Sequence, residues 1–119
     1  MFENRDTFKE FLKNSNTEVT ILKFTATWCG PCKKINPLIQ QLLQQYNNNN
    51  FRYYEVDVDT CYDTYAFFKK KRMIRGIPAF CVYYKSKYND DHFYIPETIV
   101  TGANEEMIKQ LFKDALSIK

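Results

Sequence analysis

The chemistry of this chain is indicated by the stretch Trp28-Cys29-Gly30-Pro31-Cys32. Two thiols at this spacing can close a disulfide across one turn at the start of a helix. Pro31 fits the first helical turn, where its missing N–H costs least. The free N–H groups and the dipole at that end favour a thiolate, which is the nucleophile in thiol–disulfide exchange. The spacing predicts an exposed, activated Cys29 and a buried, resolving Cys32.

Half of a structural zinc site is the alternative interpretation of the Cys-x-x-Cys spacing. Tetrahedral zinc needs two further Cys or His ligands at matching spacing. The rest of the chain offers Cys61, Cys81 and His92, which are widely separated. Since Cys-x-x-Cys beside alternating strands and helices is typical of a redox pair, we expect no metal site.

The composition is that of one globular domain. A chain of 119 residues suits a single domain, 1–119, and its 45% hydrophobic content argues against disorder. No apolar run approaches the ~20 residues of a membrane helix. The polar N-terminus carries no signal-peptide core, so we expect a cytoplasmic protein without membrane association. In that reducing compartment, four cysteines are not expected to form a disulfide scaffold.

The net charge of +3 includes one dense basic run, residues 69–72, with Arg75 close by. We interpret the run as a solvated helix face, because short charge runs are common on helices. Nucleic-acid binding would need a broader basic footprint or a recognisable module, and neither is visible in the sequence.

Hydrophobic periodicity and β-prone runs alternate along the chain. Helices are expected over residues 6–14 (capped by Asp6 or Thr7), 31–46 (kinked at Pro37), 61–71 and from Asn104 to Leu116, and strands over 19–25, 51–58, 79–84 and 99–101. Strands that alternate with helices require crossovers, so the first two strands should lie parallel in a sheet covered on both faces. The last two strands can pair as a hairpin.

With these segments in place, the chain resembles the thioredoxin family over nearly its full length. The resemblance implies an α/β thioredoxin fold, a central mixed four-stranded sheet flanked by helices on both faces. Only five residues precede Asp6, so the family's first edge strand should be short or missing. The matching segments are Ala26–Lys33, Pro37, Val56–Asp59, Arg75–Pro78 and Thr101–Asn104.

The resemblance implies an enzyme, a protein-disulfide reductase that maintains cell redox homeostasis. Cys29 would attack the target disulfide and Cys32 would resolve the mixed disulfide. A monomer without bound cofactor would take part in electron transport, receiving electrons from NADPH through thioredoxin reductase and passing them to disulfide-containing proteins. The alternatives are a thioredoxin-fold adaptor with secondary redox activity, and an oxidant or isomerase, which Gly30-Pro31 disfavours.

The resemblance also implies a substrate-binding surface around the sulfur atoms. Pro78 matches the family's cis-proline, which leaves the Ile77 backbone free to pair with an extended peptide. An ordinary turn is the alternative for Gly102. The expected surface consists of Trp28, Gly30, Pro31, Ile77, Pro78 and Gly102.

The family's buried aspartate, which helps to move the proton of the resolving cysteine, is replaced here by Lys23. Glu55 lies in the next strand, and period-two counting puts it on the face opposite Val56. We therefore predict a Lys23–Glu55 ion pair, of which either member exchanges a proton with Cys32 through water. The alternative is that Lys23 extends to solvent, as long side chains often do.

Two further differences from the family are longer segments. Residues 59–78 should add a helical turn that carries the basic run, and residues 85–95 enlarge the last hairpin. We interpret the enlarged hairpin as solvated decoration, with partner choice as the alternative, because loop tips tolerate insertion. Cys81, in an apolar strand, should be an inert core thiol. We interpret Cys61 as core or surface filler, with a partly exposed thiol that can oxidise as the alternative.

Overall fold

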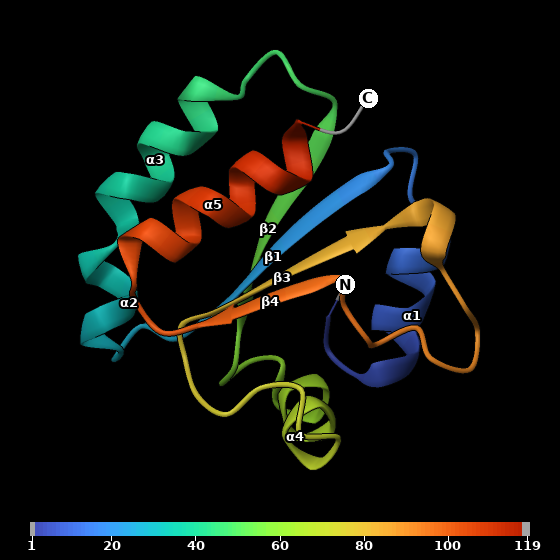
Figure 1. Cartoon of the computed structure of the whole chain (residues 1–119). Coiled ribbons are helices and arrows are strands. Elements are labelled where there is room, and N and C mark those ends of the chain that lie inside the picture. The colour runs from blue at the N-terminus through green and yellow to red at the C-terminus, as the bar shows by residue number, and fades with distance from the viewer. Residues whose placement is uncertain (1, 118–119) are drawn as a thin grey trace.

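A four-stranded sheet with strand order β2-β1-β3-β4 forms the centre of the molecule (Figure 1). The structure is a computed structural model that describes residues 2–117. β1 pairs with β2 in parallel and with β3 antiparallel, and β3 pairs antiparallel with β4. The elements are α1 (Arg5–Lys13), β1 (Val19–Thr25), α2 (Gly30–Lys34), α3 (Asn36–Gln45), β2 (Phe51–Asp57), α4 (Tyr62–Lys70), β3 (Ala79–Tyr84), the 3-10 helix η1 (Lys85–Lys87), β4 (Thr98–Thr101) and α5 (Glu105–Leu116).

Helices cover both faces of this mixed sheet, which confirms the predicted fold class. In Figure 1, α2, α3 and α5 lie on one side of the sheet and α1 and α4 on the other. Between residues 2 and 117 no strand precedes α1. No helix in this part of the chain is long and apolar enough to cross a membrane.

Central strand β1 is buried on both faces, and its successive side chains point alternately into two hydrophobic cores. Leu22 and Phe24 belong to the core beneath α1 and α4, whereas Val19 and Ile21 belong to the core beneath α3 and α5. Lys23 has the same parity as Val19 and Ile21. The sequence therefore directs a lysine side chain toward α2 and α3.

Helix α1 is capped by Asn4, so the expectation of an Asp6 or Thr7 cap is wrong. The Asn4 side chain accepts hydrogen bonds from the N–H groups of Asp6 and Thr7, both at 3.0 Å. Thr7 Oγ1 accepts from the Asn4 N–H at 3.3 Å, which completes a capping box. Thr7 is thus the third residue of the helix and the reciprocal partner of the cap.

The helix expected over residues 31–46 is two helices, α2 and α3, separated at Ile35. Pro37 has no N–H to offer the Lys33 carbonyl, and its ring crowds the preceding turn. The proline is tolerated where it stands, in the first turn of α3, for the same reason that Pro31 is tolerated in α2. The predicted kink is therefore a full break.

The enlarged hairpin, residues 85–95, is solvated only in part. Lys87, Asn89 and His92 are exposed, but Phe93 stacks on Phe67 of α4 with ring centroids 6.0 Å apart. Tyr94 also packs against Phe67, and its carbonyl accepts a hydrogen bond from Tyr83 Oη at 2.8 Å. The interpretation as solvated decoration is wrong for these aromatic side chains, because they extend the core over α4.

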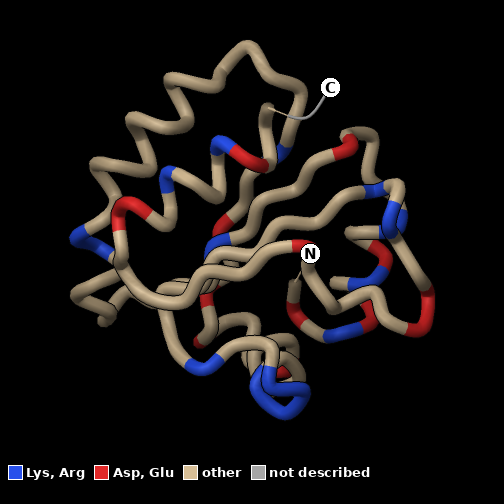
Figure 2. Tube along the Cα trace, viewed as in Figure 1, with Lys and Arg blue, Asp and Glu red and all other residues tan. Residues whose placement is uncertain are grey.

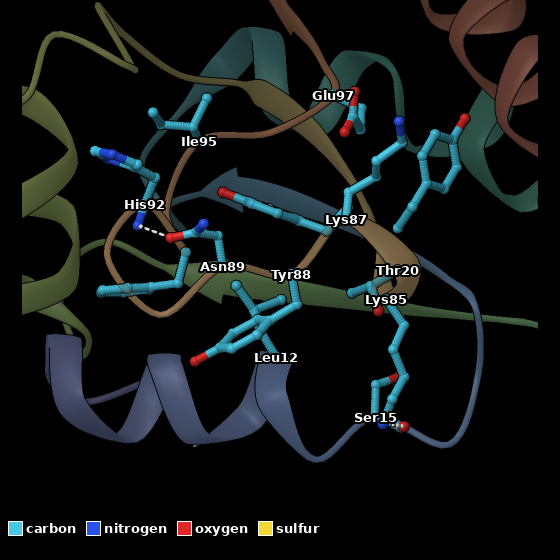
Figure 3. Close-up of a pocket in the computed structure, with 13 residues that line it drawn as sticks. Leu12, Ser15, Thr20, Lys85, Lys87, Tyr88, Asn89, His92, Ile95 and Glu97 are labelled. Atoms are coloured by element: carbon cyan, nitrogen blue, oxygen red, sulfur yellow. Dashed lines mark hydrogen bonds between the residues drawn. The ribbon is translucent and has the colours of Figure 1, made fainter.

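Figure 3 shows where this hairpin meets α1. Tyr88, Asn89 and His92 line a cavity with Leu12 of α1, and the cavity volume is about 20 Å³. That volume matches roughly one water molecule and is too small for a substrate. The hairpin therefore packs against α1 and leaves little free space between them.

Candidate active site

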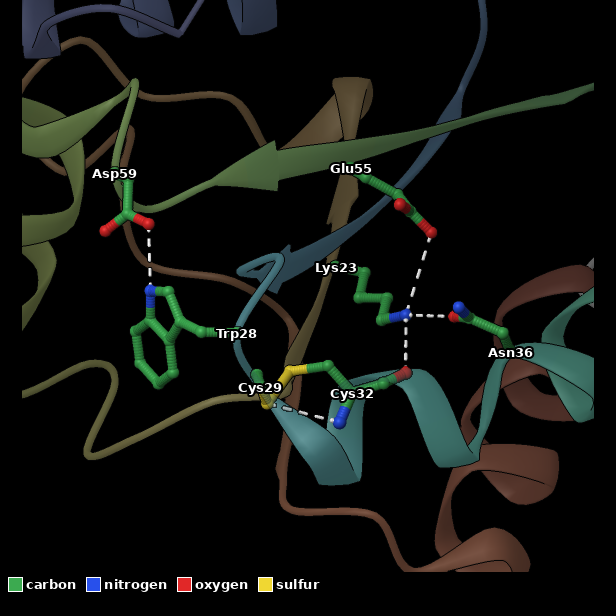
Figure 4. The surroundings of a disulfide bond; sticks show 7 residues. All are labelled: Lys23, Trp28, Cys29, Cys32, Asn36, Glu55 and Asp59. Atoms are coloured by element: carbon green, nitrogen blue, oxygen red, sulfur yellow. Dashed lines mark hydrogen bonds and ion pairs between the residues drawn. A yellow bond between two sulfur atoms is a disulfide. The ribbon is translucent and has the colours of Figure 1, made fainter.

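Cys29 and Cys32 form a disulfide at the start of α2, with their Cα atoms 5.3 Å apart (Figure 4). Cys29 is the N-cap of α2, and its Sγ accepts a hydrogen bond from the Cys32 N–H at 3.2 Å. Pro31 occupies the first helical turn, as the sequence predicts. The helix start therefore presents an N–H donor to the Cys29 sulfur, which would stabilise a thiolate there.

Both cysteines are buried in this disulfide form. Cys29 is 4% exposed and Cys32 is 1% exposed. The expectation of an exposed Cys29 is wrong for this state, because its sulfur is bonded to Cys32 and belongs to the same apolar cluster as Ala26 and Ala79. The order of exposure is as predicted, and only the edge of Cys29 reaches solvent.

The outer side of the disulfide is formed by an indole and two loops. Trp28 is 66% exposed, and its Nε1 donates to Asp59 Oδ2 at 2.8 Å, which orients the ring. The Ile77-Pro78 peptide bond is cis, as predicted. Among residues 2–117, the Ile77 backbone makes no hydrogen bond to another backbone group.

Gly102 holds the proline loop in place. Its N–H donates to the Pro78 carbonyl at 2.8 Å, and its φ of +102° lies where residues with a side chain are strained. A Cβ at Gly102 would meet no atom within 4 Å, so the requirement for glycine comes from the backbone alone.

The inner side of the disulfide is polar, and Lys23 lies at its centre. Its side chain is 1% exposed, so the alternative that Lys23 extends to solvent is wrong. Lys23 and Glu55 are paired in register across β1 and β2, and Nζ lies 3.7 Å from Glu55 Oε2. The predicted ion pair is confirmed. Lys23 Nζ also donates to Asn36 Oδ1 at 2.7 Å and to the Cys32 carbonyl at 3.1 Å (Figure 4).

These three acceptors explain how a lysine can be buried here. The last carbonyls of a helix have no partner further along it, and a cation is favoured beside them. Near the end of α2, Lys23 donates a hydrogen bond to the Cys32 carbonyl. Asn36 Oδ1 accepts a second hydrogen bond from the ammonium, and Glu55 forms an ion pair with it. Burial lowers the pKa of Lys23, and the Glu55 carboxylate opposes that shift.

Glu55 connects this buried group to solvent. Its side chain is 47% exposed and accepts a hydrogen bond from Tyr53 Oη at 3.0 Å. Burial and the neighbouring Glu55 raise the pKa of Tyr53, so its phenol stays a donor. A pocket of about 270 Å³ adjoins the group and gives water a route to Cys32 from beneath. It is lined by Thr25, Ala26, Thr27, Cys32, Lys33, Asn36, Glu55 and Asp57.

Comparison with known proteins agrees with this geometry. The family model described as Thioredoxin matches residues 1–113. A thioredoxin from Ictalurus punctatus is 36% identical over 112 residues, which cover 94% of each chain. This chain belongs to the thioredoxin family. Thioredoxin from Equus caballus is 34% identical over 111 residues, covering 93% of this chain and 92% of that one. The solution structure of oxidised thioredoxin from Plasmodium falciparum superimposes with a TM-score of 0.68 at 26% identity, covering 96% of this chain and 94% of that one.

As a thioredoxin-family member, the protein is an oxidoreductase that acts on protein disulfides, a protein-disulfide reductase. The family needs no bound cofactor. Within the part of the chain that the structure describes, no group of three or more Cys, His, Asp or Glu residues could hold a metal ion.

The other two cysteines lie inside the core. Cys81 is fully buried, as predicted, and burial raises the pKa of its thiol far above the usual range. Cys61 is buried at the start of α4, with 9% of its surface exposed, so it fills the core and the alternative of a partly exposed thiol is wrong. Cys61 belongs to the hydrophobic cluster that also contains Phe67 and Phe68, and its Sγ lies 3.7 Å from Thr60 Oγ1.

Sequence reasoning missed three residues of this thioredoxin site. Asn36 stands four positions after Cys32, which is one helical turn, and Tyr53 stands two positions before Glu55 on the same strand face. These spacings carry a usable signal once Lys23 is known to be buried. Asp59 accepts the hydrogen bond from Trp28. In the sequence it is only an acidic residue just after a predicted strand, so this contact could not be predicted.

Proposed function

We propose that the reduced protein acts through two exchange steps. The Cys29 thiolate attacks one sulfur of a substrate disulfide, so a mixed disulfide forms and one substrate thiolate leaves. Cys32 then loses its proton and attacks Cys29 Sγ, so the Cys29–Cys32 disulfide closes and the second substrate thiolate leaves. Two electrons pass to the substrate, whose sulfurs take up protons.

One observation carries this assignment of roles. Cys29 Sγ lies 3.2 Å from the Cys32 N–H at the start of α2, where its thiolate would be stabilised. Cys32 lies one turn further along α2 and lines the pocket of about 270 Å³ beside Glu55, which we call the inner pocket. Substrate would lie across Trp28, Gly30 and Pro31 and pair with the Ile77 backbone beside Pro78 and Gly102.

The oxidised protein must be returned to the dithiol by a two-electron donor. An NADPH-dependent thioredoxin reductase is the donor that family membership supports, with thiol–disulfide exchange at Cys29 and Cys32 as the entry point. We propose that the protein works as a monomeric, single-domain carrier in the cytoplasm and passes these electrons to disulfide-containing proteins.

The reduction of insulin by dithiothreitol tests the function. The wild-type protein should accelerate the precipitation of insulin chains, and Cys29→Ser should abolish the acceleration. Cys81→Ser is the matched control, because it removes a thiol that is buried and outside the site. No acceleration by the wild type would instead favour the adaptor alternative.

We also assign Lys23 and Glu55 to proton transfer at Cys32. The Cys32 thiol must lose a proton before it attacks, and the exposed Glu55 carboxylate can receive it through water in the inner pocket. Lys23 would hold that carboxylate in place and balance its charge.

Replacing Glu55 with Gln tests this role while keeping the size of the side chain. Resolution of a preformed Cys29–substrate mixed disulfide should slow by about a hundredfold, because general-base assistance is lost. Glu97→Gln, an exposed glutamate next to the enlarged hairpin, is the control and should leave the rate unchanged. Identical rates for Glu55→Gln and wild type from pH 6 to 9 would remove Glu55 from the mechanism.

A further inference from the structure

A dense cluster of cations lies at the end of α4 and on the loop that follows it. We call Lys69, Lys70, Lys71, Arg72 and Arg75 the basic surface; all five are exposed. Figure 2 shows the continuous run as a blue bend at the end of α4. None of the five forms an ion pair with another residue between 2 and 117. The cluster is therefore uncompensated locally.

Local structure accounts for three of these cations. Lys69 and Lys70 stand in the last turn of α4, where the helix dipole favours positive charge. Lys69 Nζ lies 5.4 Å from the centroid of the Tyr65 ring, and Lys71 Nζ lies 5.5 Å from that of the Tyr94 ring. These contacts fit weak surface cation–π pairs.

Arg72 is different, because the backbone disfavours a side chain at its position. Its φ is +61°, and the turn ends the helix with hydrogen bonds from the Arg72 N–H to the Lys69 carbonyl at 3.0 Å and from the Met73 N–H to the Phe68 carbonyl at 2.9 Å. Glycine is the residue that this left-handed helix-ending position favours. An arginine at this position costs conformational stability, and among residues 2–117 its side chain forms no ion pair that would offset the cost.

Two segments of the chain lead from the basic surface to the two edges of the active site. Helix α4 begins at Tyr62, which is 71% exposed and stands three residues after Asp59, the partner of Trp28. Its nine residues span about 13 Å, so the basic end lies within reach of a protein docked on Trp28. From Arg75 the chain runs directly to Ile77, whose free backbone faces an incoming peptide.

We propose that the basic surface docks an acidic segment of the substrate protein, close in space to the disulfide being reduced. This inference rests on the proposed function and adds a substrate class to it. Uncompensated cations beside a binding site raise the association rate of acidic partners and act over about a Debye length, ~10 Å at moderate salt. Salt should therefore weaken the preference.

Three disulfide peptides that differ only in their flanking residues test the proposal. One is flanked by Glu, one by Lys and one by Ser, and kcat/KM is measured at low and at high salt. The wild type should prefer the Glu peptide over the Lys peptide by about tenfold at low salt and lose most of that preference at high salt.

Charge reversal locates the effect. Lys70→Glu/Arg72→Glu should remove or invert the preference, whereas Lys109→Glu/Lys113→Glu on α5, with the same change in net charge, should keep it. Equal loss in both variants, or a wild type without preference, would overturn the docking surface. If the wild type reduces the Ser peptide but shows no preference, only the docking surface fails; if it reduces none of the three, the proposed function fails with it.

Arg72→Gly separates docking from folding. The substitution relieves the backbone, so the urea midpoint of unfolding should rise while the preference for the Glu peptide falls by severalfold. The two readouts move in opposite directions, which a purely structural role for Arg72 would not produce. A higher midpoint with an unchanged preference would overturn the part assigned to Arg72.

Discussion

The two sides of the Cys29–Cys32 disulfide differ in the chemical groups that form them. The outer side consists of an exposed indole and backbone groups, with Trp28 held by Asp59 and Pro78 held by Gly102. The inner side is a buried charge, Lys23, with three side-chain or backbone acceptors around it. Under the proposed function, the outer surface receives a polypeptide and the inner groups handle a proton.

The two sides also differ in how they tolerate change. Trp28 and Asp59 on the outer side are exposed, so water can replace the hydrogen bond between them if one partner is lost. A buried ammonium has no such substitute, and removal of one acceptor leaves a charge that is costly to keep. The inner side is therefore expected to respond to pH and to substitution as one coupled unit.

The largest effect should come from separating the two sulfur atoms. With the substrate entering from the outer side, Cys32→Ser should still attack through Cys29 and then stop, so a stable mixed disulfide accumulates and turnover falls to background. Mass spectrometry of the protein after exposure to a disulfide peptide measures the adduct. Cys29→Ser should form none, and an adduct on Cys32 of that variant would reverse the two roles.

The buried Lys23 on the inner side should make the unfolding free energy depend on pH. The pKa of Lys23 is lowered in the folded protein, so between that value and the ordinary value near 10.5 the unfolded chain binds more protons. The unfolding free energy of the wild type should then rise with pH relative to Lys23→Met, by up to about 1.4 kcal/mol per pH unit.

Urea unfolding of the oxidised protein at a series of alkaline pH values measures this difference. Lys113→Met, which removes an exposed lysine, is the control and should show a difference that does not change with pH. A flat difference for Lys23→Met would mean that the buried ammonium keeps its ordinary proton affinity.

The smallest effect concerns the outer side. Gly102→Ala forces a side chain onto a φ of +102°, so the unfolding free energy should fall by about 1–2 kcal/mol. A Cβ there meets no neighbour, so the cost is conformational and Gly30→Ala, in the first turn of α2, is the contrasting control. Equal stability of Gly102→Ala and wild type would show that the proline loop adjusts freely.

The sequence was sufficient where a local rule decides the structure. Strands β1 and β3 begin and end where predicted, because β-prone runs are bounded by polar or proline-containing segments. The positions of Cys29, Pro31 and Pro78 follow from a motif whose residues are close in the chain. The Lys23–Glu55 pair was also predictable, since period two and parallel order fix which residues share a face.

The features that could not be predicted are contacts between elements that lie far apart in the chain. The break at Ile35 brings Asn36 toward Lys23, and this contact spans thirteen positions in the chain. The burial of Cys61 and the packing of Phe93 on Phe67 depend on where α4 lies against the hairpin. A single sequence carries no signal for such placement, because the same polar and aromatic residues suit an exposed loop equally well.

Trp28 is the one tryptophan of the chain, it adjoins Cys29 in sequence, and two thirds of its surface is open to solvent. The nine tyrosines lie at other positions, so fluorescence excited at a wavelength that only indole absorbs comes from Trp28 alone. The molecule thus carries a built-in optical probe whose emission reports on the immediate surroundings of the reactive sulfurs. Titrations of redox state or of bound peptide can be followed without attaching a label.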